Sequence, residues 1–385
     1  MRVTTVTLNN YRNWARLTLT PHARLNLVSG PNAQGKSNLL EALYALVTTR
    51  PYRAARDLEV IRFGEDFAHV HATLHSESRE VSCEIAWQRA QAGGRHRKEI
   101  KVNRQPVQRL MDVFGLARMV LFTPRDLQLV QGAPEFRRQF LDIMLCQLHP
   151  AHLYALSQYQ KVLAERNRWL RTLAASGGTS RAAAQDASMH EVWTEQLVRW
   201  GTDLSDRRRA SLERLAPKLE RVYAQLCGKT DHLGLRYLPG VAPEPGESTA
   251  EALARAYRNG ARDERARGVT LFGPHRDDIA ILLDGRAMKL YGSQGQTRST
   301  AIALRLAEAE MLERDGGHAP VLLLDDCLSE IDERRQGALW EYLSMRGQVF
   351  LTTSGWDSSR ALPFDGTVWH TKAGRIQSMV DACVA

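Results

Sequence analysis

The stretch Gly30-Pro-Asn-Ala-Gln-Gly-Lys-Ser-Asn38 decides the fold of this chain. It fits the pattern G-x-x-x-x-G-K-[ST], which forms a phosphate-binding loop when it lies between a strand and a helix. Residues 25–28, Leu-Asn-Leu-Val, predict the strand, and apolar residues at helical spacing over 39–47 predict the helix. The glycines let the backbone turn tightly, so that N–H groups and the positive end of the helix face an anion.

Each residue of this loop is therefore a candidate for nucleotide contact. Lys36 is expected to reach the β- and γ-phosphates, and the Ser37 hydroxyl is expected to hold Mg²⁺. The expected nucleotide-binding residues of the loop are Gly30, Pro31, Asn32, Ala33, Gln34, Gly35, Lys36, Ser37 and Asn38.

A metal-holding carboxylate is expected in the stretch Val321-Leu-Leu-Leu-Asp-Asp326. Four apolar residues followed by two aspartates predict a buried parallel strand whose acids emerge at its carboxyl end, where ligands bind in open α/β sheets. Asp325 is the expected Mg²⁺ ligand, and Asp326 is expected to orient or deprotonate the attacking water. Two carboxylates at one place repel each other unless a cation is present, which favours a metal.

The composition predicts a soluble protein with an anionic partner. A chain of 385 residues that is 43% hydrophobic can bury a large core and is expected to hold two or more lobes. Its net charge of +9 favours nucleic acid first and an acidic membrane second, with a merely solvated basic surface as the alternative.

Cysteine usage and hydropathy predict a cytoplasmic protein. The five cysteines form no C-x-x-C pair, which is typical of a reducing compartment and gives no zinc site. They are Cys83, Cys146, Cys227, Cys327 and Cys383. Residues 1–8 alternate like a strand and not like a signal peptide, and no stretch approaches the length of a membrane span.

The first third of the chain is expected to be rich in strands. Residues 3–8 and 15–19 alternate in polarity, and the alternation in 81–87 followed by Gly93-Gly94 and 100–102 predicts a hairpin. That hairpin carries Arg95, Arg97, Lys98 and Lys101, which we interpret as a charged edge, with nucleic-acid contact as the alternative.

The middle of the chain is expected to be helical over 136–148, 153–173 and 193–226, with an interruption near Pro217 and a flexible loop over 174–188. Nothing sustains heptads long enough for coiled-coil arms. The cluster Arg207-Arg208-Arg209 predicts a solvated face, because three consecutive residues of a helix point in different directions.

The remaining elements are a Pro/Gly-rich connector over 239–248, a helix through Tyr257, and strands over 269–272 and 279–283. The last of these strands is followed by an Asp284-Gly285 turn.

A second anion-binding surface is expected where Tyr291-Gly-Ser-Gln-Gly-Gln296 precedes a helix over 297–312. The chain has a phosphate loop early, a Ser-x-Gly-Gln element late, and an apolar run ending in Asp-Asp just after that element. This order of motifs resembles that of the ATP-binding-cassette ATPases. In that group, the Ser-x-Gly-Gln element of one subunit closes on the ATP held by another. The segment Leu328-Ser-Glu-Ile-Asp332 resembles the one that crosses this interface.

The chain most specifically resembles the RecF family, the bacterial recombinational-repair ATPases of the SMC-like group. The resemblance covers nearly the whole chain. It is carried by Asn10-Tyr-Arg-Asn13, the loop 30–38, Arg137-Arg-Gln-Phe-Leu-Asp142, Ser157-Gln-Tyr-Gln-Lys161 with Arg166-Asn167, Gly273-Pro-His-Arg-Asp-Asp278, residues 291–296, and Leu324-Asp-Asp326 with Leu328-Ser-Glu330.

The resemblance implies an α/β ATPase head with mixed sheets and a helical second lobe without long coiled-coil arms. The implied lobes are 1–125 and 305–385 for the first and 126–304 for the second. It implies slow, DNA-stimulated ATP hydrolysis, ATP-dependent dimers, and binding of double-stranded DNA and single-strand/double-strand junctions. It also implies assistance to RecO and RecR in loading RecA at gaps, together with roles in replication and SOS induction.

The resemblance also assigns residues. Arg12 and Asn13 are implied to lie near the nucleotide, and Ser293, Gly295 and Gln296 to reach the nucleotide of a partner copy. Lys36 and Asp326 are the implied catalytic residues, with Ser37 and Asp325 on Mg²⁺. Asp326 stands where cassette transporters carry Glu, and Thr353-Ser-Gly-Trp356 replaces their γ-phosphate His, so weak hydrolysis is expected.

Several assignments stay open at this point. Asp126 is the candidate for the lobe-junction glutamine of cassette ATPases. His275 and Arg276 belong either to a charged turn held by ion pairs or to an interface or phosphate contact. The competing functions are a P-loop phosphotransferase acting on a small molecule and a scaffold that holds ATP without hydrolysing it.

Overall fold

The structure is a computed structural model that describes residues 1–54, 56–76, 79–90, 95–175, 187–228, 231–356, 361–372 and 374–379. The chain forms two compact units. Unit 1 comprises Met1–Val130, Lys218–Asp231 and Gly292–Ala385, and unit 2 comprises Gln131–Pro217 and His232–Tyr291. The expected turn at Gly93-Gly94 and most of the expected loop over 174–188 lie outside the described residues.

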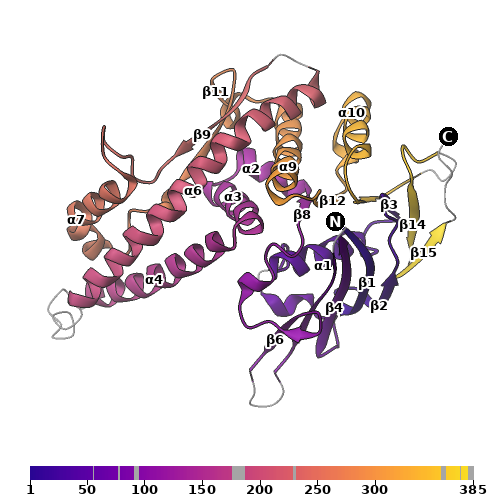
Figure 1. Ribbon diagram of the computed structural model, residues 1–385, viewed down its shortest axis with the longest axis horizontal. Helices are drawn as coiled ribbons and strands as arrows, with labels where there is room; N and C mark the ends of the chain where they lie inside the picture. Colours follow the sequence, from indigo (N-terminus) through magenta and orange to yellow (C-terminus); the bar gives the residue numbers. More distant parts are fainter. Residues whose placement is uncertain are drawn as a thin grey trace. The chain divides into compact units, whose positions relative to one another are not determined.

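Unit 1 contains two six-stranded sheets (Figure 1). The antiparallel one has the order β2-β1-β4-β5-β6-β7, and its strands are β1 (Arg2–Tyr11), β2 (Trp14–Leu19), β4 (Phe67–Ser76), β5 (Arg79–Gln88), β6 (Arg97–Val102) and β7 (Gln105–Pro106). Burial alternates along β4 and β5, because one face of the sheet covers the core. The pairing of β5 with β6 confirms the expected hairpin.

The second sheet has the order β15-β14-β3-β13-β12-β8 and is parallel except for β15. Its strands are β3 (Leu25–Ser29), β8 (Met119–Phe122), β12 (Val321–Asp325), β13 (Val349–Thr353), β14 (Gly366–Lys372) and β15 (Arg375–Met379). Strands β3 and β12 are buried at every position, including the polar Asn26 and Ser29 of β3, as is typical of parallel strands that are covered on both faces.

Helix α1 (Lys36–Thr48) contacts strands of both sheets, which explains why it is buried on all sides. The other helices of unit 1 among the described residues are α2 (Leu127–Gln131), α9 (Gln294–Gly316), α10 (Glu333–Ser344) and the last part of α6 (Ala187–Cys227). Short 3-10 turns lie at Asp57–Val60, Leu110–Asp112, Pro124–Asp126 and Leu328–Glu330.

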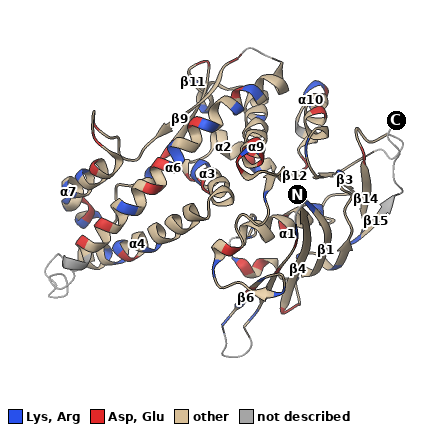
Figure 2. Cartoon of the chain, in the orientation of Figure 1, with Lys and Arg blue, Asp and Glu red and all other residues tan. Residues whose placement is uncertain are grey.

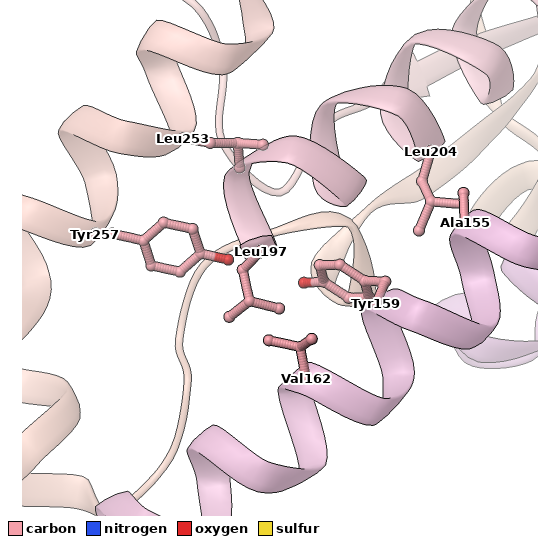
Figure 3. Close-up of a cluster of buried hydrophobic side chains, with 7 residues drawn as sticks. All are labelled: Ala155, Tyr159, Val162, Leu197, Leu204, Leu253 and Tyr257. Carbon is pink, nitrogen blue, oxygen red and sulfur yellow. The ribbon is translucent and has the colours of Figure 1, made fainter. Parts of the chain in front are cut away.

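Unit 2 is mainly helical. Its helices are α3 (Pro134–Leu148), α4 (Pro150–Ala175), the first part of α6 (Ala187–Cys227), α7 (Thr249–Arg267) and α8 (Met288–Tyr291), and its small sheet has the order β11 (Arg286–Ala287), β10 (Asp278–Leu283), β9 (Leu233–Leu238). Figure 3 shows its core, where side chains of α4, α6 and α7 meet: Ala155, Tyr159, Val162, Leu197, Leu204, Leu253 and Tyr257. Among the described residues, no helix is both long and apolar enough to cross a lipid bilayer.

Two expected features of secondary structure are wrong. Helix α6 runs through Pro217 without a break. Its neighbours Leu212, Leu215 and Leu219 are at most 3% exposed, so their packing outweighs the helix penalty of proline, about 3 kcal/mol. Residues 269–272 form no strand, because side chains satisfy their amides: Thr270 N–H donates to Asn167 Oδ1, and Leu271 N–H donates to Glu264 Oε1.

The expected solvated face at Arg207-Arg208-Arg209 is wrong for its central residue. Arg208 is 3% exposed and binds two carboxylates, with Nη2 2.7 Å from Asp142 Oδ2 and Nη1 2.9 Å from Asp277 Oδ2. Arg207 and Arg209 pair at the surface with acids of their own helix. A helix turns by about 100° per residue, so one of three consecutive arginines could face the core, and it does so because acids meet it there.

The same network joins two of the stretches that carry the family resemblance, residues 137–142 and residues 273–278. Arg137 binds Asp278 with two hydrogen bonds of 2.7 and 3.0 Å, and Asp142 and Asp277 share Arg208. Asp277 and Asp278 of this turn are therefore held by ion pairs with arginines that are distant in sequence, and the interface or phosphate contact considered for His275 and Arg276 stays a prediction. His275 donates or accepts at Tyr159 Oη, 2.7 Å away, and burial lowers its pKa to about 4.

Candidate nucleotide-binding site

The register of the parallel sheet brings the two sequence-predicted motifs to one edge. Thr353 on β13 pairs with Ser29 at the end of β3, and Asp325 at the end of β12 pairs with Thr352. The loop 30–35 follows β3 and α1 follows the loop, so the phosphate loop and the acidic pair leave the carboxyl ends of nearby strands.

The side chain of Lys36 binds backbone carbonyl groups of the phosphate loop. Lys36 Nζ donates to the carbonyl oxygens of Gly30, at 2.7 Å, and Pro31, at 2.9 Å. Burial lowers the pKa of Lys36, while the nearby Asp326 and Asp325 carboxylates oppose that shift. The ammonium thus lies inside the cradle, with an acidic pair beside it.

Asp325 is the centre of the acidic side of the site. It is 3% exposed, and its Oδ1 accepts hydrogen bonds from Ser37 Oγ at 2.6 Å and Thr352 Oγ1 at 2.9 Å. Its Oδ2 lies 2.7 Å from Arg53 Nη2 and accepts a longer bond from Tyr52 Oη. The structure thus brings together Ser37 and Asp325, the two residues expected on Mg²⁺.

The donor set fits a magnesium ion. A serine hydroxyl and a buried carboxylate in hydrogen-bond contact supply oxygen ligands of the kind that Mg²⁺ takes together with phosphate oxygens and water. Within the described part of the chain, no group of three His, Cys, Asp or Glu side chains could hold a metal by itself, so phosphate and water would have to complete the coordination.

Asp326 occupies a different environment from its neighbour. Its φ of 52° is the left-handed conformation, which few non-glycine residues adopt, and its N–H donates to Thr352. Burial and the Asp325 carboxylate raise the pKa of Asp326, and Lys36 opposes them. Its half-buried carboxyl group lines the same pocket as the phosphate loop.

A single pocket collects these groups. Its lining residues are Asn32, Ala33, Gln34, Gly35, Lys36, Ser37, Asn38, Arg53, Asp325, Asp326 and Thr352. Gly30 and Pro31, also expected to contact nucleotide, contribute the carbonyls that hold Lys36. A Cβ on Gly30 would lie 2.4 Å from the Thr371 carbonyl oxygen on β14, so this glycine allows the loop to pack on the sheet.

The turn between β1 and β2 supports the phosphate loop from outside. Asn13 Oδ1 accepts a bond from Asn38 Nδ2 at 2.8 Å, and the buried Trp14 Nε1 donates to the Gly35 carbonyl at 3.0 Å. A Cβ on Gly35 would lie 2.5 Å from Asn13 Oδ1, and its φ is +97°. Gly35 is therefore required both for its conformation and for this close approach.

Arg12 lies beside the nucleotide pocket but is firmly held. Its Nε and Nη2 donate to the buried Glu41 carboxylate at 2.9 and 3.0 Å, and its Nη1 donates to the Glu59 carbonyl. Arg12 and Asn13 both line a neighbouring hollow that shares Asn38 and Arg53 with the phosphate pocket.

The Ser-x-Gly-Gln element begins helix α9. Ser293 is the N-cap and Gln296 completes a capping box, with Ser293 Oγ accepting from Gln296 N–H and Gln296 Oε1 accepting from Ser293 N–H. Ser293 and Gln294 are exposed, and Gly295 is half-buried. Ser293, Gly295 and Gln296 are not among the residues that line the phosphate pocket of their own chain.

Asp126, the candidate for the junction glutamine, binds groups of the turn after β8 and of helix α9. Its Oδ2 caps a 3-10 turn by accepting from Thr123 N–H, and its Oδ1 lies 2.7 Å from Arg305 Nη2. It lines a small cavity that Asp326 also lines. The carboxylate thus links the turn after β8 to helix α9.

Sequence reasoning missed several residues of the site: Trp14, Glu41, Tyr52, Arg53 and Thr352. Arg53 follows α1 in a segment rich in arginine, and no spacing marks it as the partner of Asp325. A polar residue at the end of an apolar strand was the available signal for Thr352, since such positions face the ligand edge of a parallel sheet.

Comparisons with known proteins show the family of the chain. Residues 2–359 match the model of the RecF/RecN/SMC N-terminal domain family. A relative from Staphylococcus aureus (strain JH9), named DNA replication and repair protein RecF, is 35% identical over 360 residues, which cover 93% of this chain and 94% of the relative.

Solved structures of RecF are also similar. One described as recombination mediator protein RecF-ATP in the RecFOR pathway has a TM-score of 0.87 and 28% identity, covering 98% of this chain and 97% of its own. Its RecF-ATPrS counterpart gives the same TM-score at 27% identity, with 98% of both chains covered. An Smc head bound to the C-winged helix domain of ScpA shares only the fold, with a TM-score of 0.56 at 14% identity.

The fold is thus an ABC-type ATPase head of mixed α/β structure, without long coiled-coil arms among the described residues. By sequence along nearly its full length and by structure, the chain belongs to the RecF family of the RecF/RecN/SMC group.

Proposed function

We propose that this chain is an ATP-hydrolysing switch of recombinational DNA repair. The observation that carries the proposal is the single pocket in which Lys36, Ser37, Asp325 and Asp326 converge. The ATP-bound state of a similar RecF structure supports ATP as the nucleotide. Loop, lysine, hydroxyl and paired carboxylates are the groups that phosphoryl transfer to water requires.

The residues divide the chemistry among them. Lys36 leaves the loop carbonyls to bind the β- and γ-phosphate oxygens, and the loop N–H groups cradle the same phosphates. Ser37 and Asp325 would hold Mg²⁺, which would neutralise part of the charge of the phosphates. Asp326, with its raised pKa, orients the attacking water and accepts its proton.

A second copy of the chain completes the site in this proposal. Ser293 is exposed at the positive end of the 23-residue helix α9, yet it does not line the phosphate pocket of its own chain. ATP bound by one copy would be closed by Ser293, Gly295 and Gln296 of another, so that ATP stabilises the dimer and hydrolysis releases it.

Replacing Ser293 by arginine should abolish the ATP-dependent dimer while leaving ATP binding within about twofold of the wild type. The arginine removes the cap and places a bulky cation where the partner's phosphates approach. Sedimentation velocity at saturating Mg-ATP measures the mass, and fluorescent-ATP titration measures binding. Lys36→Met should instead lose both ATP binding and the dimer.

Ser248→Arg is the matched control, because Ser248 caps α7 through the same kind of capping box with Glu251. Both variants lose a cap worth about 1 kcal/mol, but only the change at Ser293 should affect association. A wild-type chain that stays monomeric at saturating Mg-ATP contradicts the dimer and favours a monomeric phosphotransferase.

The biological setting follows from the family. We propose that the chain binds double-stranded DNA and single-strand/double-strand junctions in the cytoplasm, and that DNA stimulates its weak hydrolysis. We also propose that it acts with RecO and RecR to load RecA at gaps, with consequences for replication and SOS induction. The division into an ATPase lobe of 1–125 and 305–385 and a second lobe of 126–304 belongs to the same proposal.

The distribution of charge supports DNA as the partner. Exposed Arg258, Arg262 and Arg265 form a stripe along α7, and Figure 2 shows the basic residues of this helix in blue. With a rise of about 1.5 Å per residue the stripe extends about 10 Å, enough to meet about three phosphates of one strand at about 3.4 Å each.

Reversing the charges of Arg258, Arg262 and Arg265 to Glu should weaken duplex binding and flatten its salt dependence. The slope of log K against log salt should fall by about 0.9 for each phosphate that the variant no longer neutralises. Fluorescence anisotropy at salt concentrations from about 50 to about 200 mM measures this slope. The same reversal at exposed Arg97, Arg104 and Arg109 in unit 1 is the control. Equal weakening in both variants would show that only net charge matters.

A further inference from the structure

Phe63 in unit 1 is an aromatic side chain with no cover. It is 100% exposed, whereas its neighbours Val60 and Ile61 are buried and Phe67, at the start of β4, is 48% exposed. An exposed phenyl ring leaves a large apolar surface in water, and isolated rings of this kind gain most when a flat partner covers them. The Phe63 ring is therefore fully available for contact with a ligand.

The turn that carries Phe63 is held rigidly by its neighbours. Arg62 N–H donates to the Asn10 carbonyl at 2.9 Å, and Glu65 N–H donates back to the Arg62 carbonyl at 3.1 Å. Asn10 Nδ2 holds the Glu65 carboxylate, and Arg89 Nε donates to the Glu65 carbonyl. A ring on such a turn loses little conformational freedom when it binds, so its contact energy is largely retained.

The ring borders a hollow that continues from the phosphate pocket. Phe63 lines this hollow together with Arg12, Arg62 and Arg89. The hollow and the phosphate pocket share two lining residues, Asn38 and Arg53. A nucleotide whose phosphates lie in the loop 30–37 has to place its nucleoside in a space adjoining that pocket. The hollow at Phe63 is such a space.

The chemistry of the lining matches a purine base. Phe63 offers a π-face, and Arg62 and Arg89 offer planar guanidinium groups that stack on bases and donate to ring nitrogens. Arg12 lines the same hollow, with its Nε and Nη2 donating to Glu41. Donors of this kind meet the N3 and N7 acceptors that adenine and guanine share, and a purine covers more of the ring than a pyrimidine does.

We propose that Phe63 is the stacking platform for the purine base of the nucleotide whose phosphates occupy the loop 30–37. The proposal rests on the proposed function, because it takes the bound ligand to be a nucleoside triphosphate. A protein docking on Phe63 is the competing occupant, and continuity of the hollow with the phosphate pocket favours the base.

The test separates contacts to the base from contacts to the phosphates. Stacking on an aromatic ring contributes about 1–3 kcal/mol per base, so Phe63→Ala should weaken Mg-ATP binding by about 5- to 150-fold. Binding of tripolyphosphate, which has no base, should change by less than about twofold, and wild-type affinity for UTP should be lower than for ATP. Phe63→Trp should give indole fluorescence that ATP quenches and tripolyphosphate does not.

Phe67→Ala is the matched control, because Phe67 is 48% exposed at the start of β4 but does not line the hollow. Unchanged ATP affinity in Phe63→Ala would overturn the inference, as would an equal loss of ATP and tripolyphosphate binding. If the wild-type protein binds tripolyphosphate but Phe63→Ala keeps the ATP affinity of the wild type, the proposed phosphate site is retained. Only the proposed role of Phe63 in stacking on the base is then wrong. If wild-type protein binds neither, the proposed function itself fails.

Discussion

Replacing Arg208 by alanine should lower the free energy of unfolding by about 3–5 kcal/mol, the range for breaking a buried ion pair from one side. The guanidinium makes two bonds to Asp142, one to Asp277 and one to the Pro274 carbonyl. Asp142 is 9% and Asp277 2% exposed, so the variant leaves two carboxylates without their common cation. Urea denaturation followed by circular dichroism measures the change.

Arg207→Ala is the control for this prediction. Arg207 precedes Arg208 on the same helix but pairs with Asp203 at the surface, so its removal should change the free energy of unfolding by no more than about 1 kcal/mol. Similar destabilisation in the two variants would mean that the burial of Arg208 has no energetic consequence.

The free energy of unfolding should also depend on pH through this network. Burial alone would raise the pKa of Asp142, but Arg208 and His152 lower it to about 2. An unfolded aspartate titrates near about 3.9, so this depressed pKa stabilises the wild type fully above about pH 4. That contribution disappears as the pH falls toward about 2. In Arg208→Ala the arginine no longer opposes the effect of burial, so the pKa of Asp142 rises and this group should lose less stability on acidification than in the wild type.

The phosphate site could be predicted because its information is local. Gly30 to Ser37 specify a tight turn, a cation and a helix start within eight consecutive residues, and Val321 to Asp325 specify a buried strand that ends in acid. A parallel sheet brings such strand ends together whatever lies between them in sequence, so Ser37 and Asp325 meet across 288 residues.

The supporting residues could not be predicted in the same way. Arg53 reaches Asp325, Trp14 holds the Gly35 carbonyl, and Glu41 fixes Arg12, yet each of these interactions depends on how separate elements pack. Arg208 shows the same limit. It is one of three consecutive arginines, and the sequence does not indicate which of the three faces the acids of two distant motifs.

The errors in secondary structure have a related cause. Proline and glycine propensities describe a segment in isolation, whereas Pro217 lies in a helix whose apolar face is packed on both sides of it. Residues 269–272 have the composition of a strand, but the Asn167 and Glu264 side chains take the amides that a strand partner would have used.

Asp326→Asn should slow ATP hydrolysis by about 10²- to 10⁴-fold, the typical contribution of a positioned general base, and should leave ATP binding intact. Asparagine has nearly the same shape and tolerates the left-handed conformation that Asp326 adopts, with φ of 52°. The substitution therefore removes the proton acceptor and leaves the backbone and Asp325 in place. ATP that is bound but not hydrolysed should keep two copies together, so the dimer should persist for as long as ATP is present.

Asp284→Asn is the matched control, because Asp284 has nearly the same backbone conformation, with φ of 49°, and lies in the β10–β11 turn of unit 2. Single-turnover release of phosphate measures the chemical step, and sedimentation measures the lifetime of the dimer. Hydrolysis within about twofold of the wild type would remove Asp326 from the chemistry and favour a scaffold that holds ATP without using this carboxylate. If hydrolysis is slow but the dimer does not persist, Asp326 is the general base as proposed. In that case the proposed closure of the site by a second copy is wrong.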